Sequence, residues 1–155
     1  MKKYILDTNI TSLLGSEKQV DNILLNKLYE LEDDDIIMVS IITLYETNYG
    51  LKNSVDEIQK REISKNLDFI KKFFEIVPLD LKEMDIYADL KVLYKKHTGI
   101  NQKSMKKNDL DILIASTAIA KNATLISNDK IFEKLSEIEP KFKWENWLNN
   151  DTDKK

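Results

Sequence analysis

The sequence predicts an α/β fold in which a central parallel sheet of four to five strands is flanked by helices in three layers. Short apolar runs recur along the chain, and segments in which apolar residues repeat at helical spacing lie between them. These runs do not alternate between apolar and polar residues, as strands with one face in water do. We therefore expect each strand to be buried on both faces.

Length and composition indicate one domain. The 155 residues can bury a core without extra cross-links, and we expect the domain to cover residues 1–148. Residues 149–155 include no apolar side chain and are expected to form a loose tail. The absence of cysteine excludes disulfides and thiolate sites. No signal peptide or membrane-spanning stretch is recognisable, so we expect a cytoplasmic protein.

A strand, a helix and a second strand are expected to open the chain. Residues 4–6 form a short apolar run that predicts the first strand. Apolar residues recur at helical spacing over 20–31, and an acidic cluster ends this helix. A second apolar run over 36–39 predicts the second strand. Two strands joined by a helix are expected to pair in parallel.

Two helices and a strand are expected next. The first helix spans 41–51, with Thr43 as a candidate N-cap and Gly50 as a candidate end. The second spans 55–74, where apolar residues recur at i, i+4, i+7 and i+11 and mark one buried face. A short strand at 76–77 precedes a proline.

The remaining chain continues the alternation. A helix that begins near residue 81 is expected to stop at Gly99. Residues 110–120 are nearly all apolar, which predicts a buried helix. The other elements expected are a strand at 124–126, a short helix through 132–135 and an edge strand at 142–144.

Four acidic residues are predicted to meet at one edge of the sheet. Asp7 and Asp129 each follow an apolar strand, and parallel strands end at the same edge. Glu46 belongs to the helix after the second strand, and Asp111 stands in an otherwise apolar helix. The alternative is that Asp7 and Asp111 only stabilise helix N-termini.

Asp109 competes with Asp111 as the third acid of this group. Two residues are separated by about 200° around a helix, so both acids cannot face one cleft. Ala115 and Ala118 share the face of Asp111. Small residues there would let the helix approach the sheet and bring Asp111 toward Asp7.

Four carboxylates in one cleft require a cation or protons. Two unit charges about 4 Å apart repel by about 4 kcal/mol at an effective dielectric constant of 20. Oxygen ligands favour a hard ion, which indicates Mg²⁺ or Mn²⁺. Such a site can activate water and hold the oxygens of a phosphodiester, so the predicted reaction class is phosphate-ester hydrolysis.

A basic segment precedes Asp111. Residues 91–108 contain six lysines, His97 and no acid, although the whole chain carries a net charge of −3. A flexible basic segment beside an acidic metal site is typical of a nuclease. The alternative is that the lysines only solvate a helix face and a loop. For His97 we expect packing at the core boundary.

Taken together, the motifs resemble those of a PIN-domain ribonuclease, and specifically the VapC-type toxins of bacterial type II toxin–antitoxin systems. The resemblance covers nearly the whole chain, through the order and spacing of these segments: Leu6-Asp7-Thr8-Asn9, Thr43-Leu44-Tyr45-Glu46, Tyr49-Gly50-Leu51, Val77-Pro78-Leu79-Asp80, Asp111 to Ser116, Leu125 to Asp129, and Trp144-Glu145-Asn146-Trp147.

The resemblance implies a three-layer PIN-like fold and endonucleolytic cleavage of RNA. It also implies homodimers and a cognate antitoxin protein whose tail occupies the cleft. Its catalytic set implies Mg²⁺ or Mn²⁺ as cofactor. The residues that match the family's metal ligands are Asp7, Glu46, Asp111 and Asp129.

Two further matches and two departures concern the same site. Asn9 and Ser127 would orient a carboxylate or the attacking water, and Ser127 stands where the family often has threonine. The segment from Gly99 to Asp111 is longer than expected, which would reshape the substrate groove. Asp111 is preferred to Asp109 because it matches the Asp-x-x-Ile-Ala pattern of the family.

Two other classes of protein were weighed. An aspartyl-phosphate protein of the phosphatase or receiver kind would use Asp7 as nucleophile, but it needs a second acid nearby in sequence, which Asp7-Thr8-Asn9 lacks. A binding module with a vestigial pocket is the other alternative. The presence of all four acids counts against it.

Overall fold

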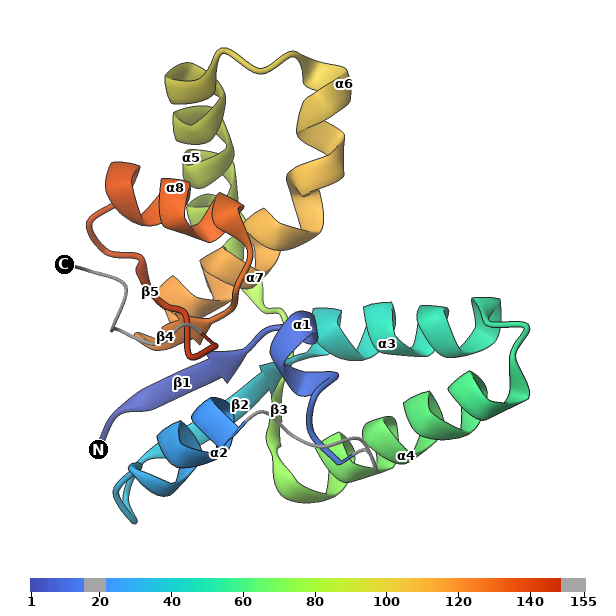
Figure 1. The fold of residues 1–155 in the computed structure, drawn as a ribbon. Coiled ribbons are helices and arrows are strands. Elements are labelled where there is room, and N and C mark those ends of the chain that lie inside the picture. Colours follow the sequence, from blue (N-terminus) through green and yellow to red (C-terminus); the bar gives the residue numbers. More distant parts are fainter. Residues whose placement is uncertain (16–21, 149–155) are drawn as a thin grey trace, which may run out of the picture.

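The computed structural model describes residues 1–15 and 22–148, and its sheet is parallel throughout (Figure 1). The five strands lie in the order β3-β2-β1-β4-β5. This arrangement confirms the predicted α/β fold class. The strands are β1 (Lys3–Leu6), β2 (Ile36–Ser40), β3 (Glu75–Val77), β4 (Thr124–Ile126) and β5 (Lys143–Glu145).

The helices lie on both faces of this sheet (Figure 1). Most agree with the predicted helices within a few residues at either end. They are α1 (Thr8–Thr11), α2 (Asn22–Tyr29), α3 (Ile41–Asn53), α4 (Glu57–Phe73), α5 (Leu81–Thr98), α6 (Gln102–Met105), the 3₁₀ helix η1 (Lys106–Asn108), α7 (Asp109–Ala120) and α8 (Lys130–Ile138).

Two apolar cores separate the three layers. Successive residues of a strand point to opposite faces, so Ile5 joins the core beneath α5, α7 and α8, whereas Leu6 joins the core beneath α1, α2 and α4. Leu125 and Ile126 divide in the same way. Each of these four side chains is fully buried. Burial on both faces explains why the strand sequences are continuously apolar.

The register of the central strands places the first candidate acid. Leu6 lies opposite Ile126 of β4, and the backbone N–H of Asp7 donates to the Ile126 carbonyl at 3.0 Å. Asp7 is therefore level with Ser127, the first residue after β4. The edge at which β1 and β4 end is the edge from which α1 and α8 begin.

Helix α3 differs from its predicted ends. Its N-cap is Ser40, whose hydroxyl accepts from the Ile42 N–H at 3.2 Å, whereas Thr43 is buried within the helix. The helix also continues past Gly50 to Asn53. A glycine inside a helix costs only about 1 kcal/mol relative to alanine, which the packing of α3 against α4 offsets.

The segment after Gly99 is helical, so the prediction of a flexible loop is wrong. Gly99 does end α5, with φ +63°. The side chain of Asn101 caps α6 by accepting from the Ser104 N–H at 2.9 Å, and the buried side chain of Met105 anchors this segment to the core. The short helix α1 was not predicted.

Other sequence-based expectations are limited or corrected by the structure. His97 is exposed rather than packed at the core boundary, because it lies on the outer side of the last turn of α5. The expected loose tail and the start of the helix predicted from residue 20 lie outside the described residues. Among the described helices, none is both long and apolar enough to cross a membrane.

Candidate active site

Asp7 is the most enclosed of the four candidate acids. It follows β1 directly and is the N-cap residue of α1, with 5% of its surface exposed. Its Oδ1 accepts from the Thr8 N–H at 2.8 Å, and its Oδ2 accepts from the Ser127 hydroxyl at 2.8 Å. Both oxygens are therefore held in fixed directions. The capping role and the role in a site are compatible here.

Ser127 connects three parts of this edge. Its Oγ donates to Asp7 and accepts from the Asn9 side-chain amide at 3.1 Å and from the Asp129 backbone N–H at 3.1 Å. The side chain of Ser127 is fully buried. One hydroxyl thus fixes the Asp7 carboxylate relative to the loop that carries Asp129.

Glu46 approaches Asp7 from α3. The Thr8 hydroxyl donates to Glu46 Oε1 at 3.1 Å, so Thr8 touches two of the candidate acids. Burial raises the pKa of the Glu46 carboxyl, the Thr8 bond lowers it, and the negative charge of Asp7 raises it further. Our sequence analysis gave no role to Thr8, although a hydroxyl directly after a strand-end acid is a usable signal.

Asp111 lies in the first turn of α7 and is half-buried. Burial, followed by the negative charges of Asp129, Asp7 and Glu46, raises the pKa of its carboxyl to about 7. Every described charge that shifts this group is negative. The charges of Asp7, Glu46 and Asp129 therefore all reach Asp111.

Asp109 has the opposite surroundings. Its Oδ1 lies 2.6 Å from the Lys91 ammonium and accepts from the Tyr87 hydroxyl at 3.1 Å. These partners, Lys91 first, lower the pKa of the Asp109 carboxyl. Two acids that differ by two positions in sequence thus face different parts of the molecule, and Asp111 is the one that lies with Asp7, Glu46 and Asp129.

The pKa of Asp7 also reflects its position. Burial raises it, the bonds from Ser127 and Thr8 lower it, and the charge of Asp129 raises it. Asp129 itself is exposed and caps α8 by accepting from the Ile131 N–H at 3.4 Å. The exposure of the acids therefore differs across the site, from the buried Asp7 directly after β1 to the solvent-facing Asp129 at the start of α8.

The donor set suits a hard divalent cation, but the side chains are not yet closed around one position. Carboxylate oxygens from four elements face one edge, and oxygen ligands are those that Mg²⁺ and Mn²⁺ prefer. Within residues 1–15 and 22–148, however, no three acidic or histidine side chains are close enough to form a ready metal cluster.

A cavity of about 450 Å³ adjoins the acids between α1, α3 and α4. Thr8 and Glu46 form the wall that it shares with the acidic site. Its other walls come from Leu13 near α1 and from Gln59 and Ile63 of α4. The acidic edge is thus continuous with a partly apolar groove that can hold part of a larger ligand.

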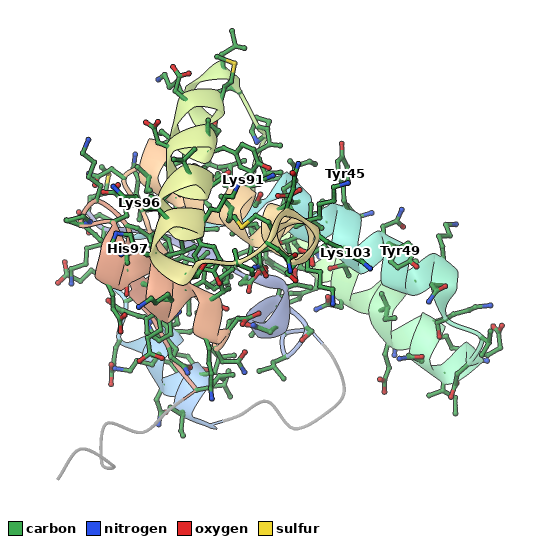
Figure 2. All side chains as sticks on the ribbon, turned by 90° about the horizontal axis from the view of Figure 1, so that it is seen from above. Tyr45, Tyr49, Lys91, Lys96, His97 and Lys103 are labelled. Atoms are coloured by element: carbon green, nitrogen blue, oxygen red, sulfur yellow. The ribbon has the colours of Figure 1, made fainter. Side chains whose placement is uncertain are left out.

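The basic segment divides between two sides of the molecule. Lys96 and His97 lie on the side of α5 that is turned away from α3, whereas Lys91 and Lys103 lie on the side toward α3 (Figure 2). Lys91 is paired with Asp109, and Lys103, Lys106 and Lys107 are exposed. Only part of this lysine-rich segment therefore flanks the acidic edge.

Comparisons with known proteins indicate the family of the chain. The model of the PIN domain family matches residues 4–138. Ribonuclease VapC2 of Rickettsia felis is 34% identical over 145 residues, covering 93% of this chain and 97% of that protein. Ribonuclease VapC of Rickettsia bellii is 28% identical over 107 residues, covering 68% of this chain and 75% of that protein.

Solved structures show the same fold. A crystal structure of VapBC2 from Rickettsia felis, bound to a DNA fragment from its promoter, matches with a TM-score of 0.73 and 30% identity over 94% of this chain and 98% of that one. The structure of FitAcB from Neisseria gonorrhoeae matches with a TM-score of 0.73 and 23% identity, over 95% of this chain and 99% of that one.

Proposed function

This chain belongs to the PIN domain family and is similar to its VapC ribonucleases over nearly its whole length, and from this premise we propose that it is a metal-dependent endoribonuclease and the toxin of a toxin–antitoxin pair. One observation carries the proposal. Asp7, Glu46 and Asp129 come from other elements to the carboxyl edge where Asp111 lies, and burial together with their negative charges raises the pKa of Asp111 to about 7.

Asp7, Glu46, Asp111 and Asp129 would hold Mg²⁺ or Mn²⁺ at this edge. When bound, the ion supplies Lewis-acid chemistry that makes water a better nucleophile and neutralises charge on the phosphate. The contribution of the chain is to keep these carboxylates in fixed orientations. Asp7 is fixed by Thr8 and Ser127, so its oxygens need little reorganisation.

Asn9, Ser127 and Thr8 would act as positioning residues. Ser127 links Asp7, Asn9 and the backbone of Asp129 through one hydroxyl, and Thr8 links Asp7 to Glu46. Outer partners of this kind keep the ligands oriented. Asp111 would release its proton when a cation binds, because a nearby positive charge lowers the pKa of a carboxyl.

The surrounding charges favour a nucleic acid substrate, and the similarity to VapC ribonucleases favours RNA. Lys103, Lys106 and Lys107 are exposed on the segment that leads into α7, and they can contact a phosphodiester backbone while Asp111 faces the acids. Lys91 is less available, since Asp109 and Tyr87 hold its ammonium. An acidic centre with lysines at its margin suits a polyanion whose reacting phosphate is held by a cation.

A cognate antitoxin is the protein partner that the relatives suggest. The structures with which this chain aligns include VapBC toxin–antitoxin complexes. The groove between α1, α3 and α4 opens beside Glu46, and its apolar walls would receive a segment of such a partner. A bound segment there would also obstruct the acids, which would inhibit the nuclease.

A homodimer is proposed as the assembly of the chain. The outer side of α5 exposes an apolar stripe, in which Leu81, Met84 and Val92 leave more than half of their surface in solvent. These residues fall near one face at helical spacing, and burying such a stripe against a second copy would remove apolar surface from water. The molar mass in solution, measured by light scattering, tests this assignment.

An aspartyl-phosphate mechanism has less support. It requires a second acid next to Asp7 and a lysine near the carboxylate, whereas the direct partners of Asp7 among the described residues are Thr8 and Ser127. A binding module without catalysis would not need four acids at one edge of the sheet, three of which (Asp7, Glu46 and Asp111) have raised pKa values.

The experiment is RNA cleavage by the purified chain with Mg²⁺, with Mn²⁺ and with EDTA. We expect cleavage with either ion, none with EDTA, and recovery when the ion is returned. Asp109→Asn is the matched control, because Asp109 is also an acid of α7 but is paired with Lys91. Cleavage that persists in EDTA, or an inactive chain with both ions, would contradict the proposal.

A further inference from the structure

The outer face of α3 carries a stripe that the acidic site does not use. Tyr45 and Tyr49 are separated by one helical turn and expose 67% and 69% of their surface. Lys52 follows at the next turn and is also exposed. Two aromatic rings and a lysine along one helix face are the components of a surface that binds unpaired bases and a phosphate backbone.

This stripe adjoins Glu46 on the same helix. Tyr49 lies three residues after Glu46, which is about 60° around the helix and one turn further along. Glu46 is half-buried and turned toward Thr8, whereas the tyrosines face solvent. A phosphate held at the acidic edge would therefore have its neighbouring nucleotide within reach of the Tyr49 ring.

The stripe is different from other exposed apolar residues of the chain. Tyr29 is even more exposed, at 84%, but lies on α2 at the opposite end of the sheet from the acids. The exposed stripe of α5 is aliphatic rather than aromatic. Aromatic rings beside the site are found on α3, where Figure 2 shows Tyr45 and Tyr49 along the helix.

Positive charge lies along the path that such a strand would follow. Lys103 lies on the side of the molecule from which α3 extends (Figure 2), and α6, the helix that carries it, lies on that side in Figure 1 as well. Lys52 provides a cation at the far end of the stripe. The acids would thus sit between two regions that can bind a nucleic acid strand.

On the basis of the proposed nuclease activity, we propose that Tyr45 and Tyr49 form a stacking platform for unpaired bases, so that the chain selects single-stranded RNA and holds it along α3. In a duplex the bases are stacked within the helix and their faces are not available to the tyrosines. The platform would act mainly on binding, and would position the nucleotides next to the phosphate at Glu46.

The test measures binding of a short fluorescein-labelled single-stranded RNA by anisotropy in EDTA, which prevents cleavage. For the double variant Tyr45→Ala/Tyr49→Ala we expect the affinity for RNA to fall about 10- to 100-fold, because the variant loses two aromatic rings and each ring stabilises binding by stacking on one base. Tyr45→Phe/Tyr49→Phe should bind within about twofold of the unchanged chain, since phenylalanine also stacks. Tyr29→Ala is the matched control and should bind normally.

Other outcomes have defined meanings. Equal affinity of the double alanine variant and the unchanged chain would overturn the platform, as would tighter binding of a duplex of the same sequence. Light scattering on the same samples is needed, because a change from dimer to monomer without RNA would assign the tyrosines to a subunit contact instead. Both side chains are exposed, so we expect thermal unfolding to be unchanged.

The platform and the nuclease activity can fail separately. If the unchanged chain cuts RNA and the double alanine variant cuts it with the same kcat/KM, the platform is wrong and the nuclease stands. If the unchanged chain cuts no RNA but its RNA binding depends on both tyrosines, the nuclease is wrong and the platform stands.

Discussion

Acids at the two ends of the central strands have pKa values shifted in opposite directions. At the amino end, Asp35 accepts from the Lys2 backbone N–H at 2.6 Å, and Asp34 lies 2.9 Å from the N-terminal ammonium. The bond from Lys2 is the main reason that the pKa of Asp35 is lowered. At the carboxyl end, the pKa values of Asp7, Glu46 and Asp111 are all raised, chiefly by burial.

The difference separates an acid that stabilises the fold from acids that oppose it when ionised. At the amino end, backbone donors meet the charge of Asp35, so its ionisation favours the folded chain. At the carboxyl end the acids lie near one another, so ionisation opposes folding unless a cation is supplied. The same residue type thus serves stability at one edge and, in our proposal, catalysis at the other.

The largest effect is expected for Asp7→Asn. The amide keeps the shape of the side chain but removes the charge that would hold the ion, which is worth several kcal/mol of transition-state stabilisation or on the order of 10³-fold in rate. RNA cleavage rates should show this loss. Asp35→Asn, the control from the amino end, should cleave within about twofold of the unchanged chain, and equal losses in both variants would refute the contrast between the ends.

A smaller loss is expected for Ser127→Ala. Without the hydroxyl, Asp7 loses one donor, and the Asn9 amide and the Asp129 N–H lose an acceptor. Positioning partners of this kind typically contribute 10- to 100-fold, so we expect about that decrease in kcat/KM and weaker dependence on the identity of the ion. Ser127→Thr keeps the hydroxyl and should restore most of the activity. Failure of threonine to do so would indicate a packing effect alone.

Asp111→Asn should stabilise the metal-free chain at high pH. The pKa of about 7 in the folded chain lies above the ordinary value of 3.8, so the carboxyl destabilises the folded state progressively as pH rises from 3.8 to about 7. Because the group is partly exposed, we expect a gain of about 1–2 kcal/mol at pH 8 and almost none near pH 3. Urea unfolding in EDTA measures it.

Asp109 provides the comparison for that prediction. Its pKa is lowered by Lys91 and Tyr87, so its contribution to stability is present above the unfolded pKa and is lost as pH falls through the folded value. Asp109→Asn should therefore destabilise the chain at pH 8. A stabilising effect of Asp109→Asn, or none of Asp111→Asn, would contradict the electrostatic difference between the two acids.

The smallest effect is expected for Asp35→Asn on stability. Asp35 is exposed, and its pKa is lowered in the folded chain. Its charge therefore stabilises the fold at pH values above the unfolded pKa, and this stabilisation is lost as pH falls through the folded pKa. Thermal unfolding should show a slight decrease in Tm at pH 7 that becomes smaller as pH falls below 3.8. The opposite pH trend would remove the distinction between the two edges.

Much of the fold could be predicted from the sequence, because apolar periodicity and the apolar runs of buried strands are local signals. Strands β1 and β4 were found from apolar runs, and the acids after them follow from parallel pairing. The role of Thr8 was missed because its contact with Glu46 joins residues 38 positions apart. The predicted end of α3 was wrong because a glycine destabilises a helix only slightly, and the packing of α4 against α3 is enough to keep Gly50 helical.

The choice between Asp109 and Asp111 needed three-dimensional information. Helical spacing shows that the two acids cannot share a cleft, but not which one faces it. Lys91 decides this by holding Asp109 at 2.6 Å. His97 was misplaced for a related reason, since apolar spacing near the end of α5 does not show that the last turn lies beyond the core.

Titration calorimetry with Mn²⁺ is the most direct test of the claim that the carboxyl-end acids form a cation site. For the unchanged chain at pH 8 we predict saturable binding, which Asp111→Asn weakens at least about tenfold and Asp109→Asn leaves unchanged. Binding should also weaken at pH 5, because protons compete for Asp111. No saturable uptake by the unchanged chain, or equal uptake by Asp111→Asn, would contradict the account.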